Sequence, residues 1–357
     1  MGKKTNIEWT KILGEGASWN FIAAFNRDTG KRGWFCVKKN SKCAHCYAET
    51  LNTGRLGNGL AYAAQNLKHV DLKLIVDHTD SSLDAPLRWR RPRGIFPCSM
   101  TDLFGEFVPE AWIGAAWTVM DLADQHIFMT LTKRPARMIE FFKNMGGKAF
   151  VSSYVPDEFV TPFIKKAVAR KGGLGVFPPP HIWIGVSIGD QEAADETLPY
   201  MHELRAILGD GATLWVSNEP SLGKVNWRGW EGLINWMVSG GESGPKARPT
   251  HPDAIRADRD WCVANGVPFF FKQWGQFDYR RIIKNTVGTC IETPNGYVTI
   301  NAAGITPLDD RYAAVRVADK HRAGNELDGQ TWAQFPPLPS GSLTLPPSVE
   351  HALRERS

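Results

Sequence analysis

The stretch HIWIGVSIGDQEAADETLPYMHELRAILGDGATLWVSN, residues 181–218, contains one complete strand–helix–strand unit. Its ends, 181–188 and 213–218, are short runs of mostly apolar residues, which is typical of strands buried on both faces of a parallel sheet. The segment between them, 190–208, carries apolar residues at three- and four-residue steps, which predicts a helix. Parallel strands need such a crossover, so this stretch indicates an α/β fold.

The same alternation extends toward both ends of the chain. Two further helices are predicted at 109–125 and 252–266, where Pro and an acidic residue open the first turn. The remaining predicted strands are 33–37, 94–100, 127–132, 234–240 and 267–274. About seven strands alternating with helices predict a (β/α) barrel, complete or partial, over residues 1–275. A doubly wound sheet is the alternative, although no GxGxxG motif follows the first predicted strand.

The sequence changes character after residue 275. The segment 276–335 contains a predicted hairpin with Asn295-Gly296 as its turn, so we expect a small extension packed on the barrel. Residues 336–357 are rich in Pro and Ser and are predicted to form a flexible tail. Within the barrel, the Gly-rich segment 144–180 is predicted to be a loop insertion.

The composition is that of a globular protein, because 43% of the 357 residues are hydrophobic and 22% are charged. The formal net charge of +5 permits a nucleic-acid partner without requiring one. No secretory signal opens the chain, and no apolar run approaches the roughly 20 residues needed to cross a bilayer. We therefore expect a cytoplasmic protein without a membrane partner, in which the six cysteines are reduced. Most of the 14 tryptophans lie in predicted strands or on apolar helix faces, and we expect them in the core.

Three of the six cysteines, Cys36, Cys43 and Cys46, fall within eleven residues. In a reducing compartment such a group is more typical of metal or redox ligands than of disulfides. A structural zinc site needs a fourth ligand, which would have to come from a distant His or from Cys98, Cys262 or Cys290. Three thiolates alone suit a [4Fe–4S] cluster with one open iron, free to bind a cofactor such as S-adenosylmethionine (SAM). The spacing leaves both alternatives open.

Polar residues follow almost every predicted strand. In a barrel the carboxyl ends of the strands carry the chemistry, so these residues are candidate ligand contacts. Several have a structural alternative: Asp102 also suits a helix cap, and Lys133 and Arg134 also suit an ion pair with Glu219. The candidates are Ser99, Asp102, Lys133, Ser187, Asn218, Glu219, Gly240, Gly241, Glu242 and Lys272.

The segment CAHCYAE, 43–49, resembles the cysteine motif of radical SAM enzymes, although the spacing here is six then two residues rather than three then two. Further matching segments spread over residues 5–335, and together they resemble a phage-borne family of uncharacterised radical SAM-like proteins that is motif-related to spore photoproduct lyase. These segments include NIEWT (6–10), APLRWRRPRGIF (85–96), SMTDLFGEFVP (99–109), LTKRPARM (131–138), SNEPSLG (217–223) and WMVSGGESGPKARP (236–249).

The resemblance implies a radical SAM-type barrel, partial or full, with a [4Fe–4S] cluster on Cys36, Cys43 and Cys46. Such enzymes take one electron from a donor such as flavodoxin or ferredoxin, cleave SAM and form a 5′-deoxyadenosyl radical that abstracts hydrogen from a substrate. The phage association implies a nucleic-acid base or modified nucleotide as substrate, for example thymine in phage DNA, and the host cytoplasm as location. The alternative is a non-catalytic zinc- or Fe–S-binding protein that binds nucleic acid through its basic residues.

The resemblance also implies roles for the candidate residues. His45 takes the place of the aromatic residue that stacks on adenine, and Ser99 and Asp102 are expected to hold the SAM ammonium group. The Gly-Gly-Glu that commonly follows the second strand in radical SAM enzymes is replaced by SMTD (99–102), and GGES appears later at 240–243. The other expected SAM contacts are Lys133, Ser187, Asn218, Gly240, Gly241 and Glu242, and the expected catalytic residues are Glu219 and Lys272.

Overall fold

The computed structural model describes residues 4–144, 156–171, 177–285, 288–293, 296–300, 302–318 and 320–339. Contacts within the chain group it into two compact units. Unit 1 comprises residues 1–186, 199–215 and 336–357, and unit 2 comprises residues 187–198 and 216–335. Within the described ranges, no helix combines the length and the apolar character needed to cross a membrane.

Seven strands form one parallel sheet in the order β1-β5-β6-β7-β8-β9-β10. The order follows the chain without a reversal, whereas a doubly wound sheet reverses at a switch point. The sheet is therefore compatible with a partial barrel. The strands are β1 (Gly16–Trp19), β5 (Gly94–Pro97), β6 (Ile127–Thr132), β7 (Ile182–Ser187), β8 (Leu214–Asn218), β9 (Trp236–Gly240) and β10 (Phe269–Gln273). All of them except β1 coincide with predicted strands, so the α/β class is confirmed.

The first strand of this sheet is not the predicted one. The segment 33–37 contributes only β3 (Arg32–Gly33), which belongs to a separate antiparallel sheet with β2 (Ile22–Asn26) and β4 (Val70–Leu74). The parallel sheet begins instead with β1, whose sequence GASW is short and rich in small residues, so no apolar run marks it. The cysteines therefore lie in the long connection between β1 and β5, and Cys36 does not directly follow a strand of the parallel sheet.

The predicted helices are confirmed, with small shifts at their ends. They correspond to α3 (Glu110–Leu122), α6 (Gln191–Leu208) and α7 (Pro252–Ala264), and the chain also forms α2 (Ala85–Arg88), α4 (Pro135–Asn144) and α5 (Pro162–Lys171). Helix α5 lies within the predicted insertion 144–180, and Lys171 Nζ joins it to α3 through Asp121 Oδ1 at 2.7 Å. Residues 145–155 and 172–176 of that insertion lie outside the described part of the chain.

Tryptophans form much of the core in both units, as predicted. The fully buried ones are Trp19, Trp117, Trp183 and Trp215 in unit 1 and Trp227, Trp230 and Trp236 in unit 2. Each such ring removes roughly 150–250 Å² of surface from water, which makes these residues a large part of the hydrophobic stabilisation. Few tryptophans are thus left to contact a ligand.

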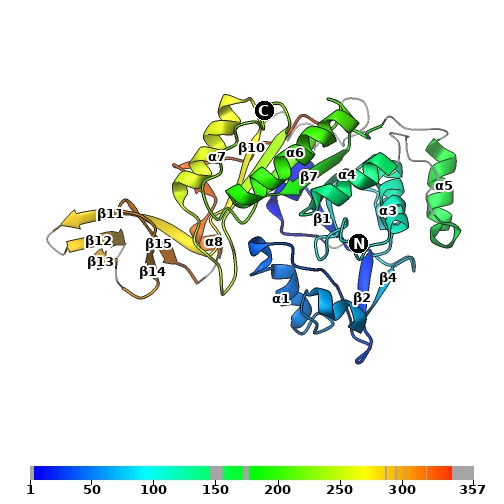
Figure 1. Cartoon of the computed structure of the whole chain (residues 1–357), viewed down its shortest axis with the longest axis horizontal. Coiled ribbons are helices and arrows are strands. Elements are labelled where there is room, and N and C mark those ends of the chain that lie inside the picture. Colours follow the sequence, from blue (N-terminus) through cyan, green and yellow to red (C-terminus); the bar gives the residue numbers. More distant parts are fainter. Residues whose placement is uncertain are drawn as a thin grey trace. The chain divides into compact units, whose positions relative to one another are not determined.

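The segment after β10 forms more than the predicted hairpin. Five antiparallel strands make a sheet in the order β13-β12-β11-β15-β14 (Figure 1). They are β11 (Phe277–Asn285), β12 (Gly288–Thr293), β13 (Gly296–Thr299), β14 (Ile305–Pro307) and β15 (Tyr312–Arg316), followed by α8 (Lys320–Ala323), β16 (Glu326–Leu327) and β17 (Gln330–Thr331). The predicted hairpin is the β12–β13 pair, although Asn295 of its turn lies outside the described residues. The same holds for residues 340–357 of the predicted tail.

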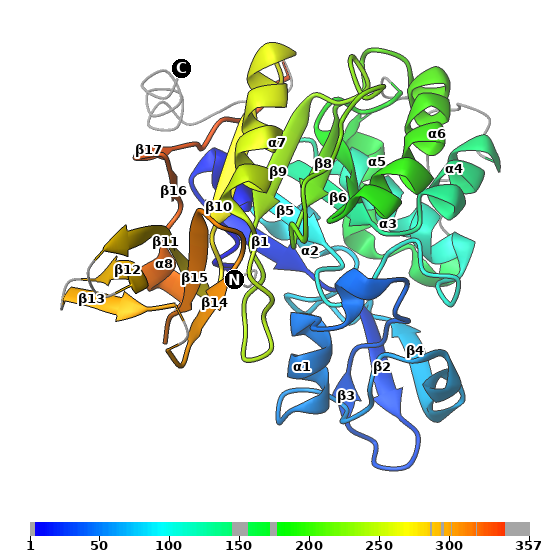
Figure 2. The same ribbon diagram turned by 60° about the vertical axis from the view of Figure 1, so that its left-hand side comes forward.

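In unit 1 the connection that carries the cysteines folds against the small antiparallel sheet. It contains η2 (Ser41–Cys43), α1 (Tyr47–Thr53) and η3 (Ala64–His69), and Figure 2 shows α1 beside β2, β3 and β4. Two buried asparagines fix its backbone: Asn52 Oδ1 accepts from Trp34 N at 2.8 Å, and Asn58 Nδ2 donates to Trp34 O at 3.0 Å. A Cβ atom on Gly33 would lie 2.3 Å from Asn58 N, so only glycine fits there. This network sets the path of the chain just before Cys36.

Candidate functional site

The three clustered cysteines lie in one half-buried loop of unit 1. Cys36, Cys43 and Cys46 are free thiols of intermediate exposure. Asn40 shapes the loop, because its Oδ1 accepts from Lys42 N at 3.3 Å and so caps η2, which ends at Cys43. Cys36 and Cys46 pack, together with Trp34, on an apolar cluster of Ala48, Tyr62 and Met100. The thiols of Cys36 and Cys46 therefore lie against apolar side chains.

Side chains and carbonyl groups tie this loop to the turn that follows β5. The hydroxyl group of Tyr47 donates to Ser99 O at 2.6 Å, and that of Tyr62 donates to Met100 O at 2.7 Å. In the opposite direction, Thr101 Oγ1 donates to the carbonyl oxygen of Phe35, directly before Cys36. The sequence SMTD thus holds the cysteine loop on both sides.

Asp102 and Arg134 form a buried ion pair at the base of the loop. Arg134 Nη1 lies 3.0 Å from Asp102 Oδ2, and the Arg134 side chain is only 4% exposed. Asp102 also accepts from Thr132 Oγ1 at 2.7 Å and from the backbone N–H groups of Phe104 and Lys133 at 3.0 and 3.1 Å. A carboxylate offers about four acceptor positions, so these contacts favour a positioning role for Asp102 over contact with a ligand.

Arg134 reaches from this pair to the cysteine loop. Its Nη2 donates to the carbonyl oxygen of Val37 at 2.6 Å, and its Nε donates to Glu106 Oε2 at 2.7 Å. Burial disfavours the charged form of the guanidinium and so lowers its pKa. The combined effect of Asp102, Cys36 and Glu106 is larger and raises the pKa of Arg134. A permanent positive charge therefore lies next to the backbone that carries Cys36.

Burial and neighbouring negative charges disfavour a free thiolate at Cys36. Desolvation, followed by the effect of Asp102, raises the pKa of Cys36 to about 12; Arg134 opposes this increase, and Cys46 and Cys43 add to it. The thiol of Cys36 is therefore within electrostatic range of the other two. Three thiolates in this loop need a compensating positive charge, and coordination of a metal centre supplies it by displacing the thiol protons. The residue types of this loop thus suit a metal or an iron–sulfur cluster, which requires the three thiols to lie closer together than the described structure places them.

Joint binding of a metal centre by Cys36, Cys43 and Cys46 stays a prediction. In the described part of the chain, no group of three or more His, Cys, Asp or Glu side chains is arranged closely enough to hold a metal ion. Of the predicted cofactor contacts, unit 1 contains His45 next to Cys46, Ser99 hydrogen-bonded through Oγ to Asn20 Nδ2 at 3.1 Å, and Lys133 next to Arg134. These residues share the cysteine loop or the turns that hold it.

The two predicted catalytic residues, both in unit 2, form an ion pair. Glu219 Oε1 lies 3.1 Å from Lys272 Nζ, and the side chains are 13% and 19% exposed. Glu219 follows β8 and Lys272 lies near the end of β10, with β9 between these strands. A Cβ atom on Gly240, at the end of β9, would lie 2.9 Å from Glu219 Oε1. The glycine therefore makes room for the Glu219 carboxylate of this pair.

The Gly241–Glu242 segment is occupied by contacts within its own loop. Arg248 donates to Glu242 Oε1 from Nη2 at 2.7 Å and to Oε2 from Nε at 2.9 Å. Arg248 N also donates to Oε2 at 2.7 Å, and a Cβ atom on Gly241 would lie 2.0 Å from Trp274 O. These contacts favour a structural role for Gly241 and Glu242 over direct contact with a cofactor.

Ser187 and Asn218 each present a buried polar atom with no hydrogen-bond partner among the described residues. These atoms are Ser187 Oγ at the end of β7 and Asn218 Oδ1 at the end of β8. A buried polar group without a partner is costly, which marks it for a ligand or an ordered water. Both residues were predicted as cofactor contacts, and that role stays a prediction.

Comparison with protein families matches residues 4–336 to DUF5131, which is described as a protein of unknown function. The chain belongs to the DUF5131 family. Comparisons with curated proteins and with solved structures gave no match. The radical SAM resemblance of this DUF5131 chain therefore remains an expectation that rests on its motifs.

The DUF5131 chain also contains a buried carboxylate that was not predicted. Asp258, on α7, is completely buried, and its Oδ2 accepts from Asn218 Nδ2 and Ser239 Oγ, each at 2.7 Å. Its Oδ1 accepts from Trp227 Nε1 at 2.8 Å. Asp258 thereby fixes the amide of Asn218 so that Oδ1 of that amide is the atom left unpaired. The missed signal was helical periodicity, because Ile255, Asp258 and Cys262 are three and four residues apart on one buried face.

Asp258 predicts a pH dependence of stability. Burial raises the pKa of Asp258 to about 6, against the opposing hydrogen bonds, whereas an aspartate in an unfolded chain has a pKa of about 3.9. Between these values the folded chain binds more protons than the unfolded chain. The free energy of unfolding should therefore fall by about 2 kcal/mol as the pH rises from about 4 to about 6. Urea unfolding should show this loss in the native sequence but not in Asp258→Asn; parallel pH profiles for the two proteins would contradict the assignment.

Proposed function

We propose that the chain is a radical SAM enzyme in which Cys36, Cys43 and Cys46 hold a [4Fe–4S] cluster. Three thiols lie in one loop, and Thr101 and Arg134 anchor the backbone on either side of its first cysteine, Cys36. This observation is the main support for the proposal. When bound, the cluster supplies the electron that cleaves SAM, and three protein ligands leave one iron open for that cofactor.

The residues around the loop position the ligands and exclude water. Arg134, held by Asp102, fixes the backbone next to Cys36 and places a positive charge beside the thiolates. Tyr47 and Tyr62 fix the segment around Cys46. Because geometry and dielectric around a cluster tune its reactivity, these contacts are part of the proposed site although none of them is a ligand.

The proposed SAM contacts divide into two groups. His45, Ser99 and Lys133 belong to the cysteine loop and its anchoring turns in unit 1. Ser187 and Asn218 belong to unit 2 and are supported by their unpaired buried oxygens. Asp102, Gly240, Gly241 and Glu242, also predicted from the sequence, are proposed to shape the site rather than to bind.

The proposed catalytic pair is Glu219 and Lys272. The ion pair keeps a proton donor and a proton acceptor together in a largely buried place, which suits proton transfer to or from a substrate. The proposed substrate is a nucleic-acid base or modified nucleotide in the cytoplasm, as the motif resemblance implies. An electron donor such as flavodoxin or ferredoxin is the corresponding partner.

Anaerobic reconstitution with iron and sulfide tests this function. We expect a brown protein with about four iron atoms per chain, which releases methionine and 5′-deoxyadenosine from SAM when dithionite supplies the electron. The alternative, a zinc-containing nucleic-acid-binding protein, predicts a colourless chain with about one zinc atom that leaves SAM intact. The second result would overturn the proposal.

A further inference from the structure

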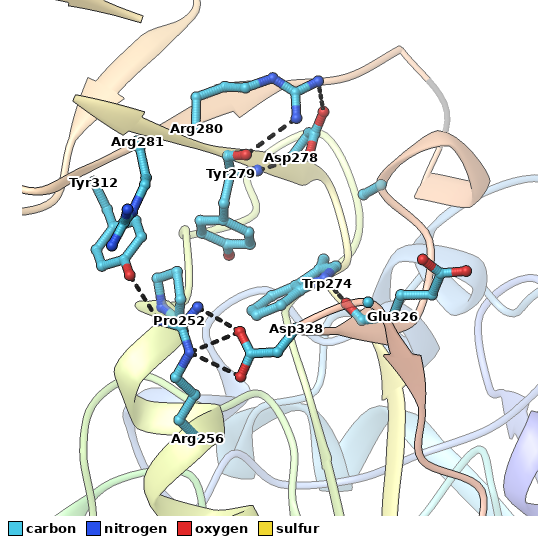
Figure 3. A pocket seen from close by; sticks show the side chains of 12 residues that line it. Pro252, Arg256, Trp274, Asp278, Tyr279, Arg280, Arg281, Tyr312, Glu326 and Asp328 are labelled. Carbon is cyan, nitrogen blue, oxygen red and sulfur yellow. Dashed lines mark hydrogen bonds and ion pairs between the residues drawn. The ribbon is translucent and has the colours of Figure 1, made fainter. Parts of the chain in front are cut away.

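Unit 2 contains a cavity of about 580 Å³ between the C-terminal antiparallel sheet, the start of α7 and β16 (Figure 3). This volume lies in the range of small-molecule sites. Aromatic rings and arginines line the cavity together: Trp274, Tyr279, Tyr312, Arg256, Arg280 and Arg281. None of these residues is needed for the function proposed above.

Strand alternation sorts the side chains of β11 into two faces. Tyr279 and Arg281 are two residues apart and lie on the same face. Arg281 is directly opposite Tyr312 of β15, so these side chains are neighbours on that face. Asp278 and Arg280 alternate with them and pair with each other, with Arg280 Nη2 at 2.5 Å from Asp278 Oδ2. The face with Tyr279 therefore combines two aromatic rings with one arginine.

Some charged side chains of the cavity have partners within the described part of the chain, and others do not. Asp328 accepts from Arg256 Nη2 at 2.7 Å and from Arg259 Nη1 at 2.7 Å, which fixes those arginines. By contrast, nothing in the described ranges forms an ion pair or side-chain hydrogen bond with the charged groups of Arg281 or Glu326. Figure 3 places these two residues on opposite sides of the rings of Tyr279 and Trp274. A ligand that carries an anionic group and a hydrogen-bond donor can therefore pair with Arg281 and with Glu326.

A second cavity, of about 520 Å³, continues along the same strand. It shares Tyr279, Arg280 and Arg281 with the first cavity and extends to Ile283, Glu292 and Thr293. The surface is therefore longer than a single small-molecule pocket. A chain-like ligand of repeating units suits such a surface better than one compact molecule does.

We propose that this surface binds a nucleoside phosphate, the unit shared by free nucleotides and single-stranded nucleic acids. Tyr279 packs on Trp274 with ring centroids 4.3 Å apart, so its ring is a fixed platform on which a base stacks. Arg281 pairs with the phosphate group, since its guanidinium matches phosphate oxygens bidentately. Glu326 accepts a hydrogen bond from an exocyclic amino group, as carboxylates do with cytosine. Arg281 and Glu326 are exposed in the chain alone, and a purely apolar ligand would cover both charged groups without pairing them.

The test measures binding to the full chain as purified, with no iron added, so that it does not depend on the cysteine site. The probe is a fluorescein-labelled oligodeoxycytidine of about ten nucleotides, followed by anisotropy at low salt. We expect saturable binding, weakened about tenfold by Arg281→Gln and about tenfold by Tyr279→Leu, with Tyr279→Phe retaining affinity. The matched control is Arg228→Gln, an exposed arginine of the same unit that lines neither cavity, and it should leave affinity unchanged.

Two further binding measurements identify the source of the nucleoside phosphate and the role of Glu326. Cytidine monophosphate competes at similar concentration if a free nucleotide is the ligand, and far more weakly if a single strand is; either result supports the shared chemistry. Oligodeoxythymidine, which lacks the amino group, should bind more weakly than oligodeoxycytidine, and Glu326→Ala should remove this preference. The proposal is overturned if neither ligand binds, or if Arg281→Gln and Arg228→Gln weaken binding equally.

Discussion

Cys43→Ala is expected to lower the iron content after reconstitution from about four atoms per chain to below about one, and to abolish SAM cleavage. Two thiolates cannot hold a cluster that already has only three protein ligands, so Cys36→Ala and Cys46→Ala should have the same effect. Iron analysis, the absorption of the cluster in the visible range and chromatography of 5′-deoxyadenosine measure the loss.

Cys262→Ala provides the matched control. Cys262 is a completely buried cysteine of α7 in unit 2, where its Sγ donates to Met237 Sδ at 3.6 Å, so it is not part of the cysteine loop. We expect this variant to lose about 1 kcal/mol of stability, because a buried sulfur is removed, but to keep its full iron content. If a variant of the clustered cysteines retains iron and SAM cleavage as Cys262→Ala does, the cluster assignment is wrong.

The parallel sheet was largely predictable because its strands are buried on both faces. Segments such as IFMTLT (127–132) and HIWIGVSI (181–188) are apolar throughout, and the structure places β6 and β7 there. Strand β1 was missed for the opposite reason. Its four residues GASW include two small ones and a serine, and its strand conformation depends on pairing with β5 rather than on its own composition.

The C-terminal sheet shows a different limit. In β11, charged residues such as Asp278, Arg280 and Arg281 interrupt the apolar pattern, because much of this strand is only partly buried. The hairpin of β12 and β13 was predicted from a local turn signal, but the pairing of β11 with β15 joins residues 31 to 39 positions apart. Local sequence does not encode such a pairing, so the cavity beside it could not be predicted either.

The candidate site, like the fold, could be predicted from the sequence only in part. Residue type and spacing led to the selection of the three cysteines, and position after strands led to that of Ser187 and Asn218; the roles of all five stay predictions. The partners of these residues were not predictable, since Asp258 reaches Asn218 across forty positions of sequence and Arg134 reaches Val37 across ninety-seven. Chemistry-bearing residues are thus visible in the sequence, whereas the residues that orient them emerge only from the fold.

Arg134→Met should lower the free energy of unfolding by about 3–5 kcal/mol. The substitution removes the cation from a buried pair, so Asp102 stays buried with a charge that only neutral donors oppose. It also removes the hydrogen bond to Val37 O, and the backbone next to Cys36 loses its anchor. Urea unfolding of the chain measures the first effect, and a lower iron content after reconstitution measures the second.

Arg91→Met is the surface counterpart of this substitution. Arg91 is 81% exposed and lies 3.9 Å from Glu15, a pair that contributes at most about 1 kcal/mol. Combining Arg134→Met with Asp102→Asn should cost less than the sum of the single variants, because the second change removes the unpaired charge. Equal losses for Arg134→Met and Arg91→Met, or strict additivity in the double variant, would show that the buried pair does not hold the cysteine loop.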